Sequence, residues 1–149
     1  MSTLPPLQYH TLRHGNRQVS IELWPRPGAA CLVFYPGTMF CPLQYRTFLH
    51  CLWKNGLAVA ALHLTGHGIN PHRCRFSFDD LLRDGLDAEQ WLFDNGMGPL
   101  LLAGHSQGGI LAMAHASRSG RMRACFAFSG IFPQSRRAIE LTRFAPWAA

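Results

Sequence analysis

Ser106 stands midway between Gly104 and Gly108, in the pattern G-x-S-x-G. An apolar run precedes this pattern and small and apolar residues at helical spacing follow it, so residues 100–113 predict a strand, a sharp turn and a helix. A serine hydroxyl at the tip of such a turn, the nucleophile elbow, can attack a carbonyl carbon when a base accepts its proton. The chemistry that this stretch could perform is therefore acyl transfer through Ser106.

The two glycines and the residue after the serine have separate tasks in this turn. Gly104 and Gly108 lack a Cβ, which lets the strand and the helix approach within a few ångströms. The backbone N–H of Gln107 falls in the first helical turn, where free donors and the positive end of the helix dipole stabilise an oxyanion. One short stretch thus predicts a nucleophile and one donor of an oxyanion hole. The plainer interpretation is a glycine-rich turn whose serine has no chemical role.

The composition favours one soluble globular unit. A chain of 149 residues that is 48% hydrophobic can bury one sizeable core, so we expect a single domain over residues 1–149. No targeting signal and no apolar run of about 20 residues is present, so we expect a cytoplasmic protein without a membrane span. Five cysteines without a C-x-x-C pair argue against a disulfide framework and against a zinc site. We expect no metal and no cofactor.

The net charge of +6 is concentrated in the last third of the chain. Residues 1–99 hold eight basic and seven acidic side chains, whereas residues 100–149 hold six arginines and Glu140 alone. Neither interleaved aromatic residues nor a known nucleic-acid-binding motif accompanies these arginines. We interpret them as a solvated basic surface and expect no nucleic-acid partner.

Strand and helix patterns alternate along the chain. The predicted strands lie at residues 19–24, 30–35, 57–64, 100–103 and 124–129, and the predicted helices at 43–53, 77–95, 107–119 and 136–144. Residues 1–18 are polar and carry no predicted element. Ser77 with Asp80 three positions on forms a short capping box at a helix start. The alternation predicts an α/β fold with a mostly parallel sheet and helices on both faces.

Four features in chain order resemble the α/β-hydrolase family. They are FYPGTM at residues 34–39, LTGHG at 64–68, GHSQGG at 104–109 and the strand at 125–129. The GHSQGG stretch is most similar to the serine aminopeptidase and monoacylglycerol lipase branch. The resemblance implies an incomplete α/β-hydrolase fold that hydrolyses a small-molecule ester or related acyl bond through an acyl-enzyme.

The same resemblance assigns roles to individual residues. Ser106 is then the nucleophile, Gln107 N–H is one oxyanion donor, and the second donor is the N–H of Thr38 or of Met39. Pro36 stands where the family commonly has a histidine, a change that leaves these backbone donors in place. His63 and His67 belong to a region that is structural in the family, so we expect packing or loop roles for both.

A base for the serine is missing from the predicted arrangement. The family order is serine, then an acid, then histidine, but only His115 and Glu140 of these types follow Ser106, in the reverse order. His115 lies nine residues along the helix, roughly 13 Å from Ser106 at ~1.5 Å per residue, which is too far for proton transfer. His105 should point away from the nucleophile.

These absences lead to three hypotheses. In the first, the chain is the amino-terminal part of a serine hydrolase, its triad acid and histidine lie elsewhere, and the isolated chain turns over little substrate. In the second, it is a non-catalytic interaction module that forms an oligomer through its open sheet edge. In the third, a complementing chain at that edge completes the triad. On the first hypothesis the sheet has an unpaired edge, and we expect the apolar side chains near it to be partly exposed unless another chain or segment covers them. These residues are Phe126, Phe128, Ile131, Phe132 and Trp147.

Overall fold

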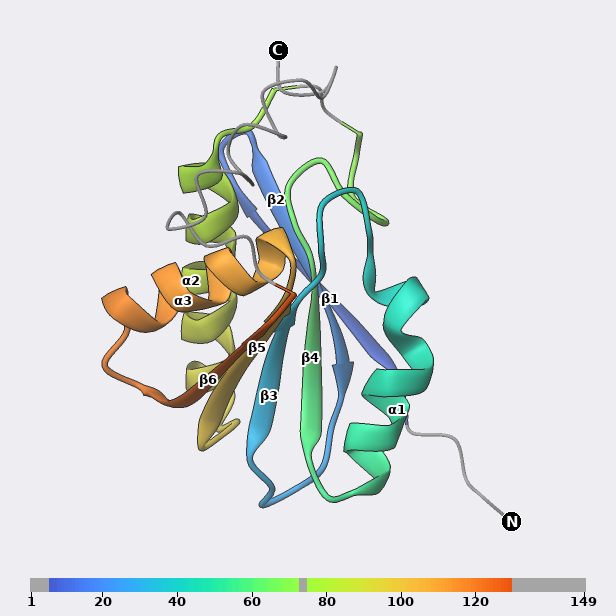
Figure 1. Ribbon diagram of the computed structural model, residues 1–149. Coiled ribbons are helices and arrows are strands. Elements are labelled where there is room, and N and C mark those ends of the chain that lie inside the picture. The colour runs from blue at the N-terminus through green and yellow to red at the C-terminus, as the bar shows by residue number, and fades with distance from the viewer. Residues whose placement is uncertain (1–5, 73–74, 130–149) are drawn as a thin grey trace.

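The computed structural model describes residues 6–72 and 75–129 and contains one six-stranded sheet (Figure 1). Its strands are β1 (Gln8–His14), β2 (Arg17–Trp24), β3 (Cys31–Tyr35), β4 (Ala58–His63), β5 (Leu100–His105) and β6 (Met122–Phe128). They are ordered β1-β2-β4-β3-β5-β6. β4, β3, β5 and β6 are mutually parallel, and β2 is antiparallel to both of its neighbours. This is the α/β fold with a mostly parallel sheet that the alternating pattern predicts.

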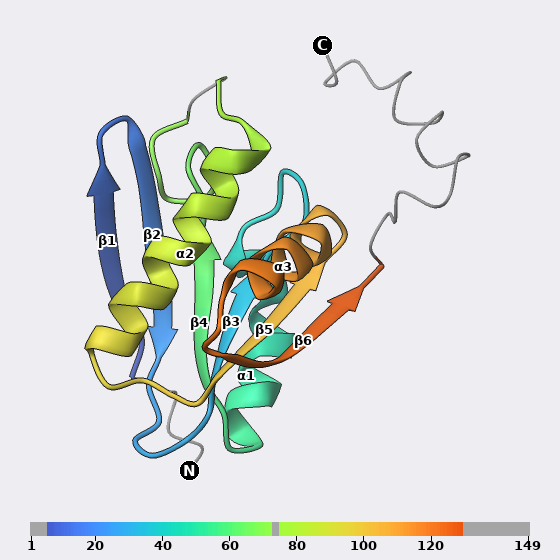
Figure 2. The same ribbon diagram turned by 90° about the vertical axis from the view of Figure 1, so that its left-hand side faces the viewer.

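In the described residues, three α-helices cover the sheet from both sides. α1 (Arg46–Lys54) lies on one face, and α2 (Phe78–Asp94) and α3 (Gln107–Arg118) lie on the other (Figure 2). The Ser77 capping box is formed as predicted, because the Ser77 hydroxyl accepts from the Asp80 N–H and the Asp80 carboxylate accepts from the Ser77 N–H. A 3-10 turn, η1 (Pro42–Tyr45), precedes α1, so that helix begins three residues later than predicted.

Residues 1–18, for which the sequence predicted neither a strand nor a helix, contain a strand. Gln8–His14 forms β1, an edge strand joined to β2 by a two-residue turn at Gly15 and Asn16. Most of its side chains are exposed, so it lacks the apolar run that marks a buried strand. Its pairing with β2 supplies the stabilisation that its own composition does not. The predicted helix at residues 136–144 lies outside the described residues.

The core has two layers, one on each side of the sheet. Along β3, Val33 and Tyr35 pack under α2 and α3, while Leu32 and Phe34 pack on the α1 side. All four are almost fully buried. Burial on both faces explains why this strand is a continuous apolar run rather than an alternating one.

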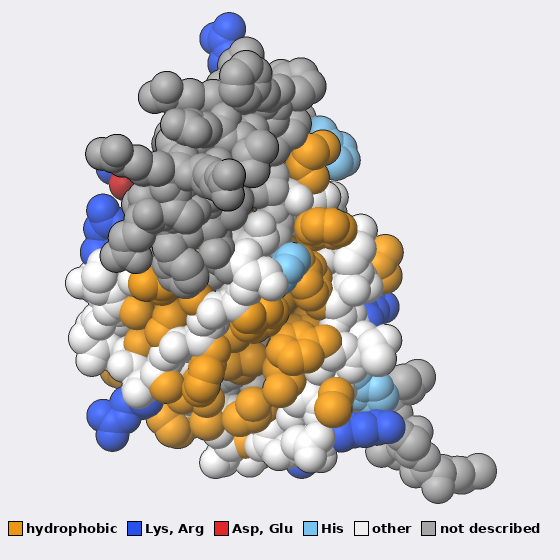
Figure 3. All heavy atoms as spheres, in the orientation of Figure 1, with side chains coloured by type: hydrophobic (Ala, Val, Ile, Leu, Met, Phe, Trp, Pro, Cys, Tyr) orange, Lys and Arg blue, Asp and Glu red, His pale blue; other side chains and the backbone are white. Residues whose placement is uncertain are grey.

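The α1 side of the sheet is only partly covered. A wholly apolar groove of about 470 Å³ lies there, and its lining consists of Leu32, Phe48, Leu52, Leu57, Leu101, Ala103, Phe126 and Phe128. Figure 3 shows apolar side chains gathered over this part of the sheet. Phe126 is 56% exposed and Phe128 is 36% exposed, which confirms the predicted exposure for these two residues. Ile131, Phe132 and Trp147 lie outside the described residues.

Candidate active site

The turn between β5 and α3 holds Ser106 in a strained conformation. Its φ of 55° and ψ of −122° place a non-glycine residue in a region that costs on the order of 1–3 kcal/mol. Two hydrogen bonds hold it there, because the Ser106 N–H donates to the Phe128 carbonyl at 3.0 Å and the Gly109 N–H donates to the Ser106 carbonyl at 2.9 Å. The serine is thus fixed by β6 on one side and by the first turn of α3 on the other.

Backbone atoms fill the space beside both flanking glycines. A Cβ on Gly104 would lie 2.0 Å from the carbonyl oxygen of Gly108. A Cβ on Gly108 would lie 2.3 Å from the carbonyl oxygens of Tyr35 and Pro36. Because these neighbours are backbone rather than flexible side chains, the turn has room for no side chain at either position.

The loop after β3 lies next to the start of α3. Phe40 N–H donates to the Gly37 carbonyl at 3.1 Å, which closes a turn in which Met39 has a φ of 61°. The Thr38 hydroxyl donates to the Gln107 side-chain oxygen at 2.9 Å. This bond joins the two segments that are expected to form the oxyanion hole.

Backbone donors remain free at this junction. Gly37 N–H is engaged, because it donates to the Tyr45 hydroxyl at 3.0 Å. The N–H groups of Thr38 and Met39 have no acceptor among residues 6–72 and 75–129. Gln107 N–H belongs to the first turn of α3, where no intrahelical acceptor exists. Three donors are therefore available at the carboxyl ends of the adjacent strands β3 and β5.

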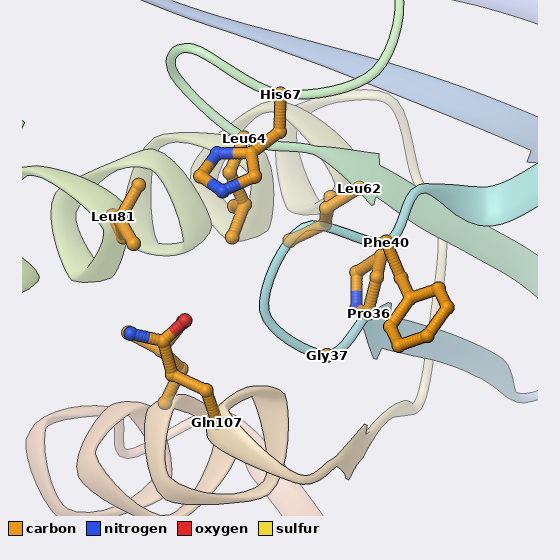
Figure 4. Close-up of a pocket in the computed structure, with 9 residues that line it drawn as sticks. Pro36, Gly37, Phe40, Leu62, Leu64, His67, Leu81 and Gln107 are labelled. Carbon is orange, nitrogen blue, oxygen red and sulfur yellow. The ribbon is translucent and has the colours of Figure 1, made fainter. Parts of the chain in front are cut away.

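A small pocket lies beside these donors, between the ends of β3 and β4 and the helices α2 and α3. Its lining consists of Pro36, Gly37, Phe40, Leu62, Leu64, His67, Leu81, Gln107 and Leu111. In Figure 4 the side chains of His67 and Gln107 extend toward the pocket from opposite sides. Its volume of about 10 Å³ leaves room for about one water molecule.

His67 has a defined tautomer in this pocket. Its Nδ1 lies 2.9 Å from the Thr65 carbonyl oxygen, and a carbonyl can only accept, so Nδ1 carries the proton. The ring also packs on Phe76 at a centroid separation of 4.9 Å. His67 therefore has the expected loop contacts, but sequence reasoning missed its position beside Gln107. The available signal was that both residues follow parallel strands, whose carboxyl ends share one edge of the sheet.

The structure brings no histidine to the serine hydroxyl. All eight histidines lie within the described residues, and none of them hydrogen-bonds Ser106. The Nδ1 atom of His105 lies 2.8 Å from the Tyr45 hydroxyl, so that ring is engaged away from Ser106. His63 is buried, with its Nε2 atom 3.3 Å from the Glu22 carboxylate, in keeping with the packing role expected for it.

His115 is also excluded as a base for Ser106. It is fully buried between Tyr35 and Glu89. Burial lowers its pKa below the ordinary histidine value, although the nearby Glu89 carboxylate opposes that shift. Glu140 lies outside the described residues.

In residues 6–72 and 75–129, no group of three His, Cys, Asp or Glu side chains is arranged to hold a metal ion. Within the same part of the chain, none of the helices combines the length and the apolar character needed to cross a bilayer.

Comparison with solved structures shows close likeness in fold. An esterase of Pyrococcus furiosus superimposes with a TM-score of 0.80 at 16% identity, over 95% of this chain and 60% of the esterase. The α/β hydrolase GrgF from Penicillium sp. sh18 gives 0.76 at 18% identity, over 93% and 53%. A thioesterase domain from the curacin biosynthetic pathway gives 0.70 at 24% identity, over 92% and 51%. The chain thus spans between about half and three fifths of the length of these proteins.

Sequence comparison places the chain in a family. No curated protein matches it by sequence. The family model described as "Alpha/beta hydrolase family" matches residues 27–149, which include β3, the Ser106 turn and β6. With this match and the strand order described above, the chain belongs to the α/β hydrolase family.

Proposed function

We propose that this chain carries the nucleophile and the oxyanion hole of a serine hydrolase that cleaves small ester or related acyl bonds. The observation that carries the proposal is the strained Ser106, held between β5 and α3 beside free backbone donors. The structural neighbours support the hydrolase class, since they include an esterase and a thioesterase domain. The GHSQGG stretch supports a serine aminopeptidase-like or monoacylglycerol lipase-like branch.

The proposed reaction proceeds through an acyl-enzyme. The Ser106 Oγ bonds to the substrate carbonyl carbon while a base accepts the hydroxyl proton, and the carbonyl oxygen becomes an oxyanion. Gln107 N–H and the N–H of Thr38 or Met39 stabilise that charge, each donor contributing ~2.7–4 kcal/mol to transition-state stabilisation in comparable sites. The C–O bond of the ester breaks, the leaving alcohol takes the proton, and water then releases the acid from Ser106.

The base and its orienting acid are proposed to lie on polypeptide that this sequence does not contain. None of the eight histidines hydrogen-bonds Ser106, and the matched proteins are longer than this chain by more than half. We therefore expect this chain alone to hydrolyse activated esters slowly, if at all.

An activated fluorophosphonate probe tests the proposal. We expect mass spectrometry to find little adduct on Ser106 in this chain alone, and rapid labelling of Ser106 when a carboxyl-terminal polypeptide that supplies the histidine and acid is added. Ser106→Ala is the matched control and should abolish labelling. Rapid labelling of the chain alone would contradict the missing base, and no labelling of the completed protein would contradict the serine hydrolase.

The second candidate function is a non-catalytic interaction module. The apolar groove beside β6, the edge strand of the sheet in the described residues, favours it, because contiguous exposed apolar surface marks interaction sites. In this function, β6 strands of two copies pair and bury Phe126 and Phe128. Light scattering should then find a dimer that persists in Ser106→Ala and dissociates in Phe126→Glu. A monomer at all concentrations would exclude this candidate.

A further inference from the structure

A hydroxyl, an imidazole and a carboxylate are joined in a buried chain outside the Ser106 turn. The Tyr35 hydroxyl lies 2.7 Å from His115 Nδ1, and His115 Nε2 lies 2.5 Å from the Glu89 carboxylate. Tyr35 and His115 are fully buried, and Glu89 is 4% exposed. These three residues come from β3, α3 and α2, so the chain of bonds ties one strand to both helices on its face.

The direction of the two hydrogen bonds follows from their partners. The Glu89 carboxylate accepts, so His115 Nε2 carries the proton and Nδ1 accepts from the Tyr35 hydroxyl. The other Glu89 oxygen accepts from the Ser119 hydroxyl at 2.8 Å and lies 3.5 Å from an Arg121 guanidinium nitrogen. Every member of the chain therefore has its partner, as a buried polar network requires.

The order of groups resembles a catalytic triad, but the hydroxyl cannot react with a substrate. Tyr35 is fully buried, and on the helix side its hydroxyl lies against His115 of α3 and Gly85 of α2. Burial, together with the negative charges of Asp84 and Glu89, raises the pKa of Tyr35 well above that of a free phenol. The network can act only by holding β3, α2 and α3 in position.

The helix α2 has a gap that fits the phenol. A Cβ on Gly85 would lie 1.4 Å from the Tyr35 hydroxyl oxygen, so the ring occupies the place where any other residue would project. Glu89 follows Gly85 by four residues and lies on the same helix face. The helix thus accepts the tyrosine at one turn and supplies its carboxylate at the next.

Tyr35 is directly joined to the candidate site. It is the last residue of β3 and immediately precedes the loop at residues 36–40. Its carbonyl abuts Gly108 in the first turn of α3, and its side chain reaches His115, which is seven residues, or roughly 10 Å, further along that helix. Contact at two separated points on one helix prevents β3 from sliding or rotating relative to α3.

We propose that Tyr35, His115 and Glu89 are positioning residues that set the spacing between the loop at residues 36–40 and the start of α3. Because Thr38 and Met39 lie on that loop and Gln107 begins α3, the network fixes the width of the oxyanion hole. This inference rests on the proposed function for its chemical meaning. Its geometric content is independent of catalysis and can be measured in the chain itself.

Backbone amide NMR of the ¹⁵N-labelled chain tests the geometry. Tyr35→Phe removes only the hydroxyl, and we expect the amide resonances of Gln107 and of Thr38 or Met39 to shift although none of them contacts that hydroxyl. The matched control is Tyr9→Phe, which removes a hydrogen-bonded hydroxyl on the edge strand β1 and should leave these resonances in place. Thermal unfolding of both variants reports the stability change separately.

If Tyr35 contributed to stability alone, the Tyr35→Phe variant would give a different result. Tyr35→Phe would then lower the melting temperature while the three amide resonances stay where they are, and that result would overturn the proposal. His115→Gln provides a second variant should Tyr35→Phe fail to fold, and it should shift the same amides. Combining the two substitutions should add no further shift, because either one already breaks the Tyr35–His115 bond.

The completed protein separates this inference from the proposed function. If Ser106 is labelled by the fluorophosphonate, Tyr35→Phe should slow labelling by about 10- to 100-fold, since a displacement of about 1 Å can have that effect. If Ser106 is never labelled but the amides shift in Tyr35→Phe, the hydrolase proposal fails and the positioning role stands. Unchanged labelling in Tyr35→Phe would contradict the positioning role alone.

Discussion

The two faces of the sheet differ in how completely they are covered. Under α2 and α3, polar and apolar side chains are interlocked, and Tyr35, His115 and Leu111 are at most 1% exposed. On the α1 side, Trp24, Phe34 and Leu49 are buried. Next to them, the sheet carries the open apolar groove that Phe126 and Phe128 help to line. The candidate site is therefore anchored on the fully packed face, and the free surface lies on the other.

The two faces of the sheet therefore have different roles. The packed face holds Ser106 and the loop at residues 36–40 in fixed positions, which a site of preorganised donors requires. The α1 side contributes the Tyr45 hydroxyl, which accepts from the Gly37 N–H of that loop, and it carries the exposed apolar groove. Substitutions on the two faces should accordingly have effects of very different size.

The largest effect is expected where backbone meets backbone. Gly104→Ala would place a Cβ 2.0 Å from the Gly108 carbonyl oxygen. We therefore expect the free energy of unfolding to fall by about 3–5 kcal/mol, or the chain not to fold. Urea unfolding followed by circular dichroism measures it. Gly120→Ala, where the added Cβ meets nothing within 4 Å, is the control and should stay within about 0.5 kcal/mol of the parent. Equal midpoints for the two variants would show that the turn adjusts easily.

A core truncation under α2 and α3 should have the next largest effect. Leu111→Ala removes a side chain that is 1% exposed, and the cavity left behind should lower the free energy of unfolding by about 2–5 kcal/mol. The same urea titration checks the value. A decrease in the free energy of unfolding below about 1 kcal/mol would mean that the side chains under α2 and α3 repack, so that this face is not more rigid than the α1 side.

A charge on the open face should change surface behaviour more than stability. Phe126→Glu replaces a side chain that is 56% exposed, so we expect the free energy of unfolding to change by less than about 0.5 kcal/mol. Binding of an apolar dye such as ANS should fall. A destabilisation as large as that of Leu111→Ala would show that the groove is covered by other parts of the chain.

The smallest effect concerns pH. Burial lowers the pKa of His115 below 6.5, so its neutral form stabilises the fold above about pH 6.5, and this stability is lost as the pH falls toward the folded-state pKa. When the pH is lowered from 7.5 to 5.5, the free energy of unfolding should therefore fall less in His115→Gln than in the parent. Urea unfolding at both pH values measures it. His72→Gln, at an exposed position, is the control and should follow the parent. Parallel behaviour of His115→Gln and the parent would contradict the buried neutral imidazole.

Local patterns in the sequence were sufficient for most of the fold. The apolar runs predicted β3, β4 and β5 because each strand is buried on both faces. The capping box at Ser77 and the glycines around Ser106 act within a few residues, so their effect could be inferred from neighbouring residues alone. β1 was not predicted because its stability comes from pairing with β2 rather than from its own composition.

The sequence by itself determined where the strand, turn and helix at Ser106 form and which backbone donors start α3, since these features depend on residues close along the chain. Only the tertiary structure decided that His67 lies in a pocket with Gln107, that Thr38 bonds Gln107, and that His115 bonds both Tyr35 and Glu89. These contacts join residues between 26 and 80 positions apart. They depend on the order of the strands in the sheet, and local periodicity carries no record of that order.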